Sequence, residues 1–338
     1  MKLGASYFGN RILRHVREDM EKMINDGCNY VVHTMSEYDI TYHPENMIDI
    51  VKAGKEAGLS VFLDPWGVGR VFGGESFSTF VKQYPGARQK LSFAEGDINA
   101  NKACLNSQAF KAKMIEWIEL AAQTEADGIF WDEPHLFYGE LTELFGKKRI
   151  IWGCACTACK DIFKDYYGYE MPLDFTEHVT EFRQNTILNF IEYLSDVSSK
   201  KGLKNAVCVF PSNEPKYGIY QWEGIVKMKN IDIFGSDPYW FCYNKNVSDF
   251  VKTISCEVVK LCEKFHKEPQ IWIQGFRVPE GREEEVSTAI KVAYDSGVRN
   301  IATWSFEAGA CMSYISSDRP DMVWDKISTK YKELQLRD

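Results

Sequence analysis

Short apolar segments alternate with longer amphipathic segments along the whole chain, and this alternation most restricts the fold. The apolar segments are bounded by turn residues, as buried parallel strands are. In the intervening segments apolar residues recur three and four positions apart. One such segment, 11–27, ends on Gly27 and predicts a helix with a glycine beyond its last turn. We count eight apolar segments, at 2–8, 30–35, 60–65, 128–133, 205–210, 231–236, 270–274 and 300–306. This pattern predicts an α/β fold, a single (β/α)8 TIM barrel over residues 1–338.

Two connections are much longer than the others, at about 66–106 and about 134–172. They follow the third and the fourth predicted strands. Loops of this length in a compact domain are usually functional or carry small elements of their own. Because both follow the carboxyl ends of strands, where barrels carry their active sites, we expect the two insertions to pack together over one rim.

Composition excludes several classes of partner. The 338 residues have a formal net charge of −8, and the basic residues are scattered among acidic ones. Neither nucleic acid nor an anionic membrane is therefore an expected partner. No segment resembles a signal peptide or a membrane span, so we expect a cytoplasmic protein that acts on a small molecule or glycan. The sequence leaves open whether the chain forms a homo-oligomer.

Polar residues recur where the predicted strands end. They are Asp64, Asp132, Glu133, Glu214, Asp237, Gln274 and Glu307. Aromatic residues accompany them, namely Trp66, Trp131, Tyr138, Tyr239, Trp240, Phe276 and Trp304. Carboxylates that move protons, set among aromatic faces on which sugar rings can stack, indicate a carbohydrate substrate. Asp64 and Asp237 both precede a proline, and Asp-Pro is also an ordinary turn initiator.

Glu133 is the predicted general acid. A glycosidase needs one carboxyl that stays protonated near neutral pH, and the adjacent Asp132 would raise the pKa of Glu133. Neighbours in a regular strand point to opposite faces, so both side chains can face one site only if the strand breaks. Pro134 makes a break at this point plausible.

Three cysteines follow in a C-x-C-x-x-C spacing, at Cys154, Cys156 and Cys159, and Cys104 is the best candidate for a fourth ligand. Four thiolates form a closed tetrahedral zinc site, which is structural because no position is left for substrate. Such a site would join the two insertions; the alternative is a set of reduced, unliganded thiols. The remaining cysteines occur singly and are expected to be small buried apolar side chains: Cys28, Cys208, Cys242, Cys256, Cys262 and Cys311.

The segment 104–172 resembles the zinc-containing β-galactosidases of glycoside hydrolase family 42 and their clan relatives. The resemblance rests on the acidic pair, the cysteine spacing and the C-L-N-x-x-A-F motif that begins at Cys104. It implies a (β/α)8 barrel with Glu133 as acid/base and Cys104, Cys154, Cys156 and Cys159 as ligands of a structural zinc. Two departures matter: Asp132 replaces the family's asparagine, and Gln274 stands where its nucleophilic glutamate should be. Glutamine cannot be that nucleophile, so the family's retaining mechanism does not carry over.

Four alternatives follow from this departure. Asp237 or Glu307 could be the second catalytic carboxylate, as nucleophile or as base. Asp132 and Glu133 could instead act as the Asp-Glu pair of substrate-assisted hexosaminidases does, with Tyr239 and Trp304 enclosing an acetamido group. A carbohydrate-binding pseudoenzyme without a nucleophile is a third reading. A catalytic metal held by carboxylates, with His33 or His135, is the fourth. Asp64, Trp66, Tyr239, Trp240, Gln274 and Trp304 are the predicted substrate-binding residues.

Overall fold

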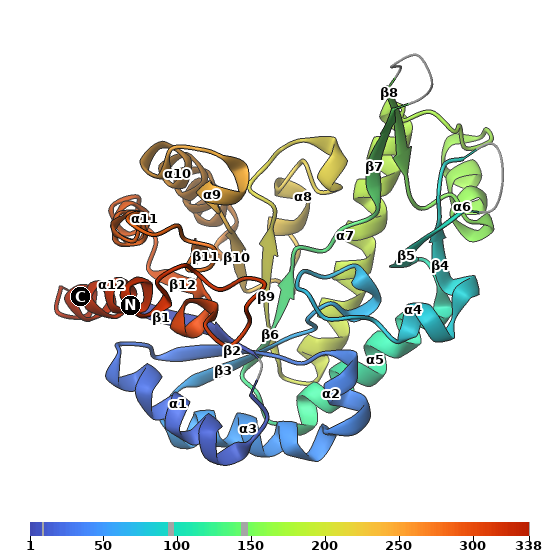
Figure 1. Cartoon of the computed structure of the whole chain (residues 1–338). Coiled ribbons are helices and arrows are strands. Elements are labelled where there is room, and N and C mark those ends of the chain that lie inside the picture. The colour runs from blue at the N-terminus through green and yellow to red at the C-terminus, as the bar shows by residue number, and fades with distance from the viewer. Residues whose placement is uncertain (9, 94–97, 143–147, 338) are drawn as a thin grey trace.

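The structure is a closed eight-stranded parallel barrel, which confirms the predicted fold (Figure 1). It is a computed structural model that describes residues 1–8, 10–93, 98–142 and 148–337. Around the barrel the strands follow the order β1-β12-β11-β10-β9-β6-β3-β2. Their bounds are β1 Lys2–Tyr7, β2 Tyr30–Thr34, β3 Ser60–Asp64, β6 Gly128–Asp132, β9 Lys204–Val209, β10 Ile233–Ser236, β11 Glu268–Gln274 and β12 Asn300–Trp304. Each predicted apolar segment overlaps one of these strands.

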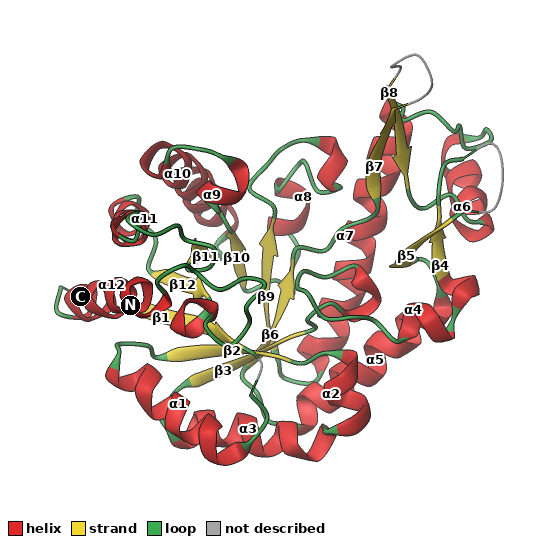
Figure 2. Ribbon diagram, in the orientation of Figure 1, coloured by secondary structure: helices red, strands yellow, loops and turns green. Residues whose placement is uncertain are grey.

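Helices cover the outside of the barrel and connect consecutive strands (Figure 2). Their apolar faces pack on the strands, as in α1, where Val16, Met20 and Met23 are buried. Gly27 follows α1 with a φ of 94°, as its predicted position beyond the helix requires. The longer helices are α1 Leu13–Asn25, α3 Pro44–Glu56, α5 Gln108–Gln123, α7 Glu177–Lys200, α10 Val247–Phe265, α11 Glu284–Asp295 and α12 Pro320–Gln335. The shorter ones are α2 Glu37–Tyr42, α4 Phe80–Gln83, α6 Thr157–Tyr167, α8 Glu223–Val226 and α9 Trp240–Tyr243.

The barrel interior is filled by large side chains that face small ones. A Cβ on Gly4 of β1 would lie 2.5 Å from the Tyr30 ring, so only glycine fits there. Between β6 and β11, the rings of Phe130 and Trp272 pack with their centroids 4.7 Å apart. Such filling is typical of TIM barrels and leaves the carboxyl ends of the strands as the place for a site.

The two insertions lie side by side at one edge of the barrel (Figure 1). The first contains α4 and an antiparallel hairpin of β4 Arg88–Lys90 and β5 Asn99–Ala103; the second contains a hairpin of β7 Tyr138–Thr142 and β8 Lys148–Trp152, followed by α6. The Ser92 N–H donates to the Trp152 carbonyl (2.9 Å), and the Ala155 N–H donates to the Lys90 carbonyl (2.8 Å). Residues 94–97 and 143–147 of these insertions lie outside the described residues.

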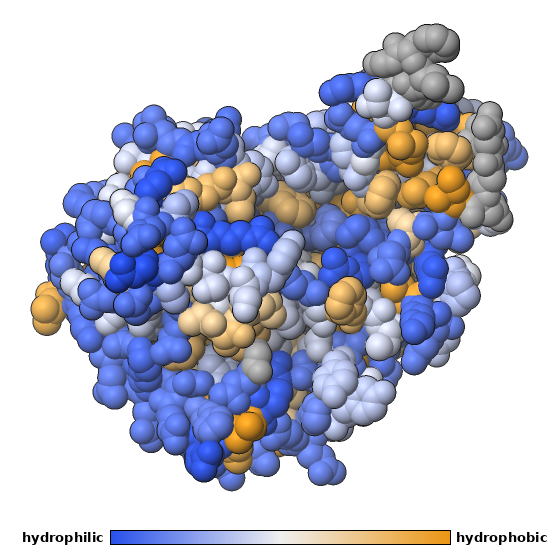
Figure 3. All heavy atoms as spheres, viewed as in Figure 1, coloured by the Kyte–Doolittle hydropathy of each residue, from blue (hydrophilic) through white to orange (hydrophobic). Residues whose placement is uncertain are grey.

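The face shown in Figure 3 is mostly hydrophilic, and apolar side chains gather on it around the β7–β8 hairpin. Leu141 on β7 and Ile98 next to β5 are examples of exposed apolar residues in this region. Within the described part of the chain, no helix is both long enough and apolar enough to span a bilayer.

Candidate active site

A cavity of about 350 Å³ opens at the carboxyl ends of the barrel strands. Its walls come from the loop after β3, the ends of β6 and β12, and the segments after β9, β10 and β11. Three of the lining residues are predicted catalytic ones, Asp132, Glu133 and Asp237. The others are Gly74, Glu75, Phe210, Tyr217, Tyr239, Cys242, Tyr243, Phe276 and Trp304. The structure therefore brings acids and aromatic rings together at the face where barrels carry their active sites.

The break in the chain after β6 allows two adjacent acids to share this cavity. β6 ends at Asp132, and Glu133 has a φ of 39°, in the left-handed region. Its N–H still donates to the Cys208 carbonyl of β9 (3.0 Å), so the residue remains fixed to the barrel. A left-handed conformation costs a non-glycine residue roughly 1–2 kcal/mol, and such conformations cluster at functional sites.

The side chains of Glu133 and Asp237 interact with each other, and each changes the pKa of the other. Burial raises the pKa of Glu133 most, and the negative charge of Asp237 raises it further. Burial also raises the pKa of Asp237, and the hydrogen bond from Glu133 partly offsets that effect. The pair can therefore offer one protonated and one ionised carboxyl at the same pH.

Asp132 and Asp64 lie next to this pair. The Asp132 carboxylate occupies the space beside Gly73, where a Cβ would lie only 2.1 Å from Oδ2. Asp64 is fully buried at the end of β3, and neither of its carboxylate oxygens has a hydrogen-bond partner among the described residues. Burial, then the charges of Asp132 and Glu75, raise the pKa of Asp64.

Glu75 is a site residue that the sequence did not reveal. It lies in the loop after β3, lines the cavity, and has a pKa raised chiefly by burial. Its Oε2 is buried and makes no hydrogen bond of ordinary length to any described residue, although an interaction with Trp66 partly offsets the rise in pKa. The rule that locates acids at strand ends cannot find a residue within a long insertion. Only the short Gly73-Gly74-Glu75 sequence hinted at a close approach of the backbone to other groups.

A histidine and a lysine form a chain of polar contacts that begins at the backbone carbonyl of Glu133. His135 Nδ1 lies 2.6 Å from the Glu133 carbonyl oxygen, and Lys102 Nζ lies 2.7 Å from His135 Nε2. Burial lowers the pKa of His135 to about 3, so the ring is neutral and can donate to the carbonyl while accepting from lysine. Burial also lowers the pKa of Lys102 to about 8. His33 is fully buried, and its Nε2 lies near Gly54 of α3, outside the barrel interior.

Four predicted substrate-binding residues do not line the cavity: the fully buried Asp64, and Gln274, Trp240 and Trp66. Gln274 is buried: its Oε1 accepts from the Phe241 N–H (3.1 Å) and its Nε2 donates to the Phe276 carbonyl (3.1 Å). Trp240 is also buried, where its indole donates to Glu285 (2.8 Å). Trp66 stacks on Phe8 with ring centroids 5.5 Å apart, behind the lining residue Gly74. Gln274 and Trp240 position loops, whereas the predicted Tyr239 and Trp304 do face the cavity.

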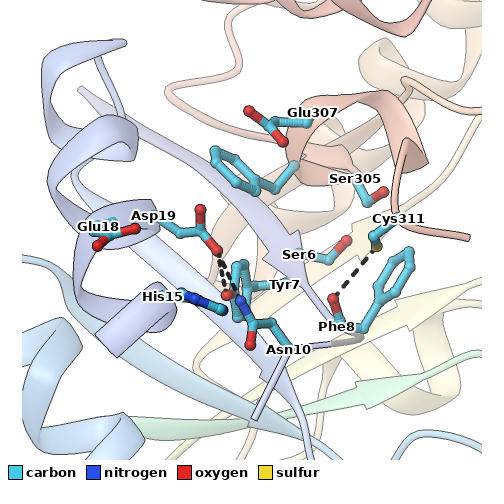
Figure 4. A pocket seen from close by; sticks show the side chains of 11 residues that line it. Ser6, Tyr7, Phe8, Asn10, His15, Glu18, Asp19, Ser305, Glu307 and Cys311 are labelled. Atoms are coloured by element: carbon cyan, nitrogen blue, oxygen red, sulfur yellow. Dashed lines mark hydrogen bonds between the residues drawn. The ribbon is translucent and has the colours of Figure 1, made fainter. Parts of the chain in front are cut away.

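Glu307 lies in a different cavity, between α1 and the loop after β12 (Figure 4). Figure 4 shows it opposite Asp19, which accepts a hydrogen bond from Tyr7. The chain turns away after β12, with φ values of 48° at Glu307 and 53° at Ala308, and the Glu307 carboxylate lies 3.6 Å from Lys22 Nζ. The expectation that Glu307 could partner Glu133 is therefore corrected. Glu214 is exposed and pairs with Lys216 (2.7 Å).

The four cysteines of the predicted metal site converge between the two insertions. All four Sγ atoms lie within 4.8 Å of one another, with Cys104 Sγ at 3.5 Å from Cys159 Sγ and 3.7 Å from Cys156 Sγ. Zinc–sulfur bonds of about 2.3 Å in a tetrahedron require sulfur–sulfur separations of about 3.8 Å, so the cluster could hold zinc. Asn106 Nδ2 donates to Cys159 Sγ (3.3 Å). Across the described residues, no other group of three or more potential ligands converges in this way.

The single cysteines divide into two groups. Cys28, Cys208 and Cys262 are buried, as expected of small apolar side chains. The same expectation was wrong for Cys242, Cys256 and Cys311, which are exposed. Apolar neighbours in the sequence do not determine which side of a helix or loop a cysteine faces.

Comparisons with known proteins support the fold. Neither a protein-family model nor a curated protein sequence matches the chain. Among solved structures, it is similar to the catalytic domain of a β-amylase from Paenibacillus polymyxa (TM-score 0.65, 10% identity, 98% of both chains covered). It is also similar to an endo-1,4-β-mannanase from Rhizomucor miehei (TM-score 0.62, 10% identity, 98% of this chain and 95% of that chain covered). A D-allulose 3-epimerase from Methylomonas sp. has a TM-score of 0.50 at 11% identity, with 100% of this chain and 97% of that one covered. At these identities the similarity shows the barrel fold alone.

Proposed function

We propose that the protein is a glycoside hydrolase whose reacting groups are the carboxyls of Glu133 and Asp237. The observation that carries the proposal is that both carboxyls line one cavity walled by aromatic rings. Cleavage of a glycosidic bond needs one protonated and one ionised carboxyl on either side of that bond. The aromatic rings offer apolar faces to a sugar. Two of the similar structures, a β-amylase and an endo-1,4-β-mannanase, support a carbohydrate substrate.

We expect the reaction to proceed with retention of configuration. Retaining enzymes hold them about 5–5.5 Å apart and inverting enzymes about 6.5–9.5 Å apart, leaving room for a water. The mutual interaction of Glu133 and Asp237 favours the shorter of these two separations. Asp237 would attack the anomeric carbon while Glu133 protonates the departing oxygen. Glu133, now ionised, would then take a proton from the water that releases the sugar from Asp237.

A second candidate mechanism is favoured by the adjacent acids. Asp132 and Glu133 line the same cavity as Tyr239 and Trp304, the arrangement needed for assistance by a substrate acetamido group. In that mechanism Asp132 would orient the acetamido group, and Asp237 would not form a bond to sugar. The two mechanisms therefore differ in what the loss of Asp237 does.

The experiment that tests the function is hydrolysis of a panel of α- and β-nitrophenyl glycosides, N-acetylhexosaminides included. Wild type is compared with Glu133→Gln, Asp237→Asn and, as a control with a carboxyl outside the cavity, Glu307→Gln. We expect loss of turnover in the first two variants only, together with capture of a 2-fluoro sugar on Asp237 by mass spectrometry. Hydrolysis restricted to N-acetylhexosaminides, with no sugar captured, would favour the acetamido route. Sugar binding without turnover by wild type would indicate a pseudoenzyme.

We also propose that Cys104, Cys154, Cys156 and Cys159 hold a structural zinc ion. The converging thiols and the resemblance to the zinc-containing β-galactosidases support this proposal. Bound zinc would cross-link the two insertions. It would not take part in the reaction, because four thiolates leave no open coordination position for substrate or water. We expect one zinc per chain by elemental analysis of purified protein. Cys154→Ser should lower both zinc content and thermal stability, whereas Cys256→Ser, at an exposed cysteine, should change neither. Zinc-free wild type with unchanged stability would contradict the proposal.

A further inference from the structure

Aromatic side chains continue from the active-site cavity to the second insertion. Phe210 and Tyr217 both line the cavity, and their ring centroids lie 5.0 Å apart. Beyond the cavity, Tyr138 at the start of β7 contacts Phe175 edge to face, with ring centroids 5.7 Å apart. All four side chains are partly exposed. These four residues, which we call the aromatic row, extend the wall of the cavity outwards.

One buried arginine holds the two halves of the aromatic row together. Arg183 of α7 is fully buried. Its guanidinium donates to the Phe137 carbonyl (2.9 Å), next to Tyr138, and to the Lys216 carbonyl (3.4 Å), next to Tyr217. Because a buried charge needs such hydrogen bonds, the start of β7 and the segment after β9 are held at a fixed separation.

An ion pair lies between the two halves of the aromatic row. Lys216 Nζ lies 2.7 Å from the Glu214 carboxylate and 5.1 Å from the centroid of the Tyr217 ring. The pKa of Tyr138 is raised, chiefly by burial, and the positive charge of Lys216 partly offsets the rise, so these two side chains are also neighbours. A sugar unit has an apolar ring face and a rim of hydroxyls. The rings of the row suit that face, and the ammonium and carboxylate suit the hydroxyls.

The aromatic row begins on the side of the proposed general acid. The ring centroid of Phe210 lies 5.6 Å from that of His135, and His135 contacts the Glu133 carbonyl. A general acid protonates the oxygen of the departing group, so that group lies on the acid's side of the cleaved bond. A molecule bound along the row is therefore the leaving group.

The side of the cavity near Asp237 is built differently. Tyr239, two residues after Asp237, packs edge to face against Phe276, with ring centroids 5.1 Å apart. Phe276 and Trp304 line the cavity with only 9% and 7% of their surfaces exposed. These rings enclose the sugar that Asp237 would attack, whereas the partly exposed rings of the aromatic row continue away from the cavity.

We infer that the leaving group is a carbohydrate chain whose sugar units bind along the aromatic row, the first at Phe210 and Tyr217 and the next at Tyr138. This inference rests on the proposed glycoside hydrolase function and names its substrate class, an oligosaccharide or polysaccharide with at least two units beyond the cleaved bond. Tyr138 is then a specificity-determining residue that lies outside the cavity.

The experiment measures how kcat/KM depends on the length of the leaving group. The probes are the nitrophenyl glycoside that the panel identifies and α-1,4- and β-1,4-linked chains of two to five units of the same sugar. We expect kcat/KM to rise about tenfold or more from two units to four for one linkage. Tyr138→Ala should lower the ratio of kcat/KM for the four-unit chain to that for the nitrophenyl glycoside about tenfold, and Tyr138→Phe, which keeps the ring, should retain the ratio. Tyr193→Ala, at a partly exposed tyrosine of α7 on the outside of the barrel, is the matched control and should not change the ratio.

The outcomes separate this inference from the proposed function. A kcat/KM that does not rise with chain length, or an equal loss on short and long substrates in Tyr138→Ala, would overturn the inference and leave the hydrolase standing. If no glycoside is hydrolysed, the proposed function fails, and calorimetry with β-1,4-linked mannose chains and α-1,4-linked glucose chains decides the inference. Affinity that increases with length and falls in Tyr138→Ala would support the aromatic row as a carbohydrate site. Absent or length-independent binding would overturn it.

Discussion

Replacing Gly73 with alanine tests whether the position of Asp132 matters for activity. Gly73 holds the end of β6 through a hydrogen bond from its N–H to the Asp132 carbonyl (2.9 Å). A Cβ at this glycine would lie 2.1 Å from Asp132 Oδ2, whereas real Cβ atoms essentially never approach a neighbour closer than 3.0 Å. The carboxylate must therefore move by about 0.9 Å, the difference between these distances. A displacement of about 1 Å in an active site can lower turnover about 100-fold, equivalent to about 2.7 kcal/mol of transition-state stabilisation.

The assay is kcat/KM on the best glycoside of the panel, with a thermal melt of each variant. Gly86→Ala is the matched control, because a Cβ there meets nothing within 4 Å and the residue lies in the same insertion. We expect the Gly73 variant to lose about 100-fold in kcat/KM and to keep its melting temperature within a few degrees, and the control to match wild type. Full activity of Gly73→Ala beside an inactive Asp132→Asn would refute the argument that Asp132 has only one productive position. Full activity of both would remove Asp132 from the site.

Three further predictions concern charge. Glu75 raises the pKa of Glu133, so Glu75→Gln should lower that pKa. Since the general acid must be protonated, the fall of kcat/KM at high pH should then begin at lower pH. Gln274→Glu would set a carboxylate against the Phe276 carbonyl, and we expect a loss of roughly 1–3 kcal/mol in unfolding free energy with no gain of activity. Asp64 has a raised pKa in the folded state, so its charge destabilises the fold as pH rises above the unfolded pKa. Asp64→Asn should therefore raise the melting temperature at neutral pH and not at acidic pH, where the native carboxyl is already protonated.

Each of these predictions has a control of the same chemistry at an exposed position. Glu307→Gln should leave the pH profile unchanged because Glu307 lies outside the cavity. Gln83→Glu and Asp49→Asn, both at exposed sites, should leave the melting temperature unchanged. Contrary results would be an unshifted pH profile for Glu75→Gln, an unchanged melting temperature for Gln274→Glu, or equal effects of Asp64→Asn at both pH values.

The barrel was predictable because strands have a fixed period. Side chains in a strand alternate, and strands buried on both faces appear as continuous apolar runs, so the eight strands could be located from the sequence. The same reasoning placed Asp132, Glu133 and Asp237 at strand ends. Their positions could be predicted because each is the last residue of a strand or the residue directly after it. The cysteine cluster could be located because ligand spacing in a metal site is characteristic.

Other residues could not be placed because their directions depend on tertiary contacts. Glu307 lies three positions beyond β12, and the left-handed angles of that turn direct its side chain towards α1. Gln274 ends β11 as expected, yet its hydrogen bonds to neighbouring loops cover it. Trp240 begins a short helix that buries it, and Glu75 reaches the cavity from the middle of a long insertion. None of these positions can be predicted from the alternation of side chains along a strand or from the repeat of a helix.

The strand β5 links the sulfur cluster to the backbone of the proposed general acid, Glu133. Its Lys102 contacts His135, which contacts the carbonyl of Glu133, and the next residue but one, Cys104, belongs to the sulfur cluster. A shift of β5 along its own axis would change the sulfur cluster and the backbone of the acid together. The position of the Glu133 backbone therefore depends on the sulfur cluster, which lies outside the barrel. Substitutions near the cysteines can change the orientation of the Glu133 carboxyl although they do not line the cavity.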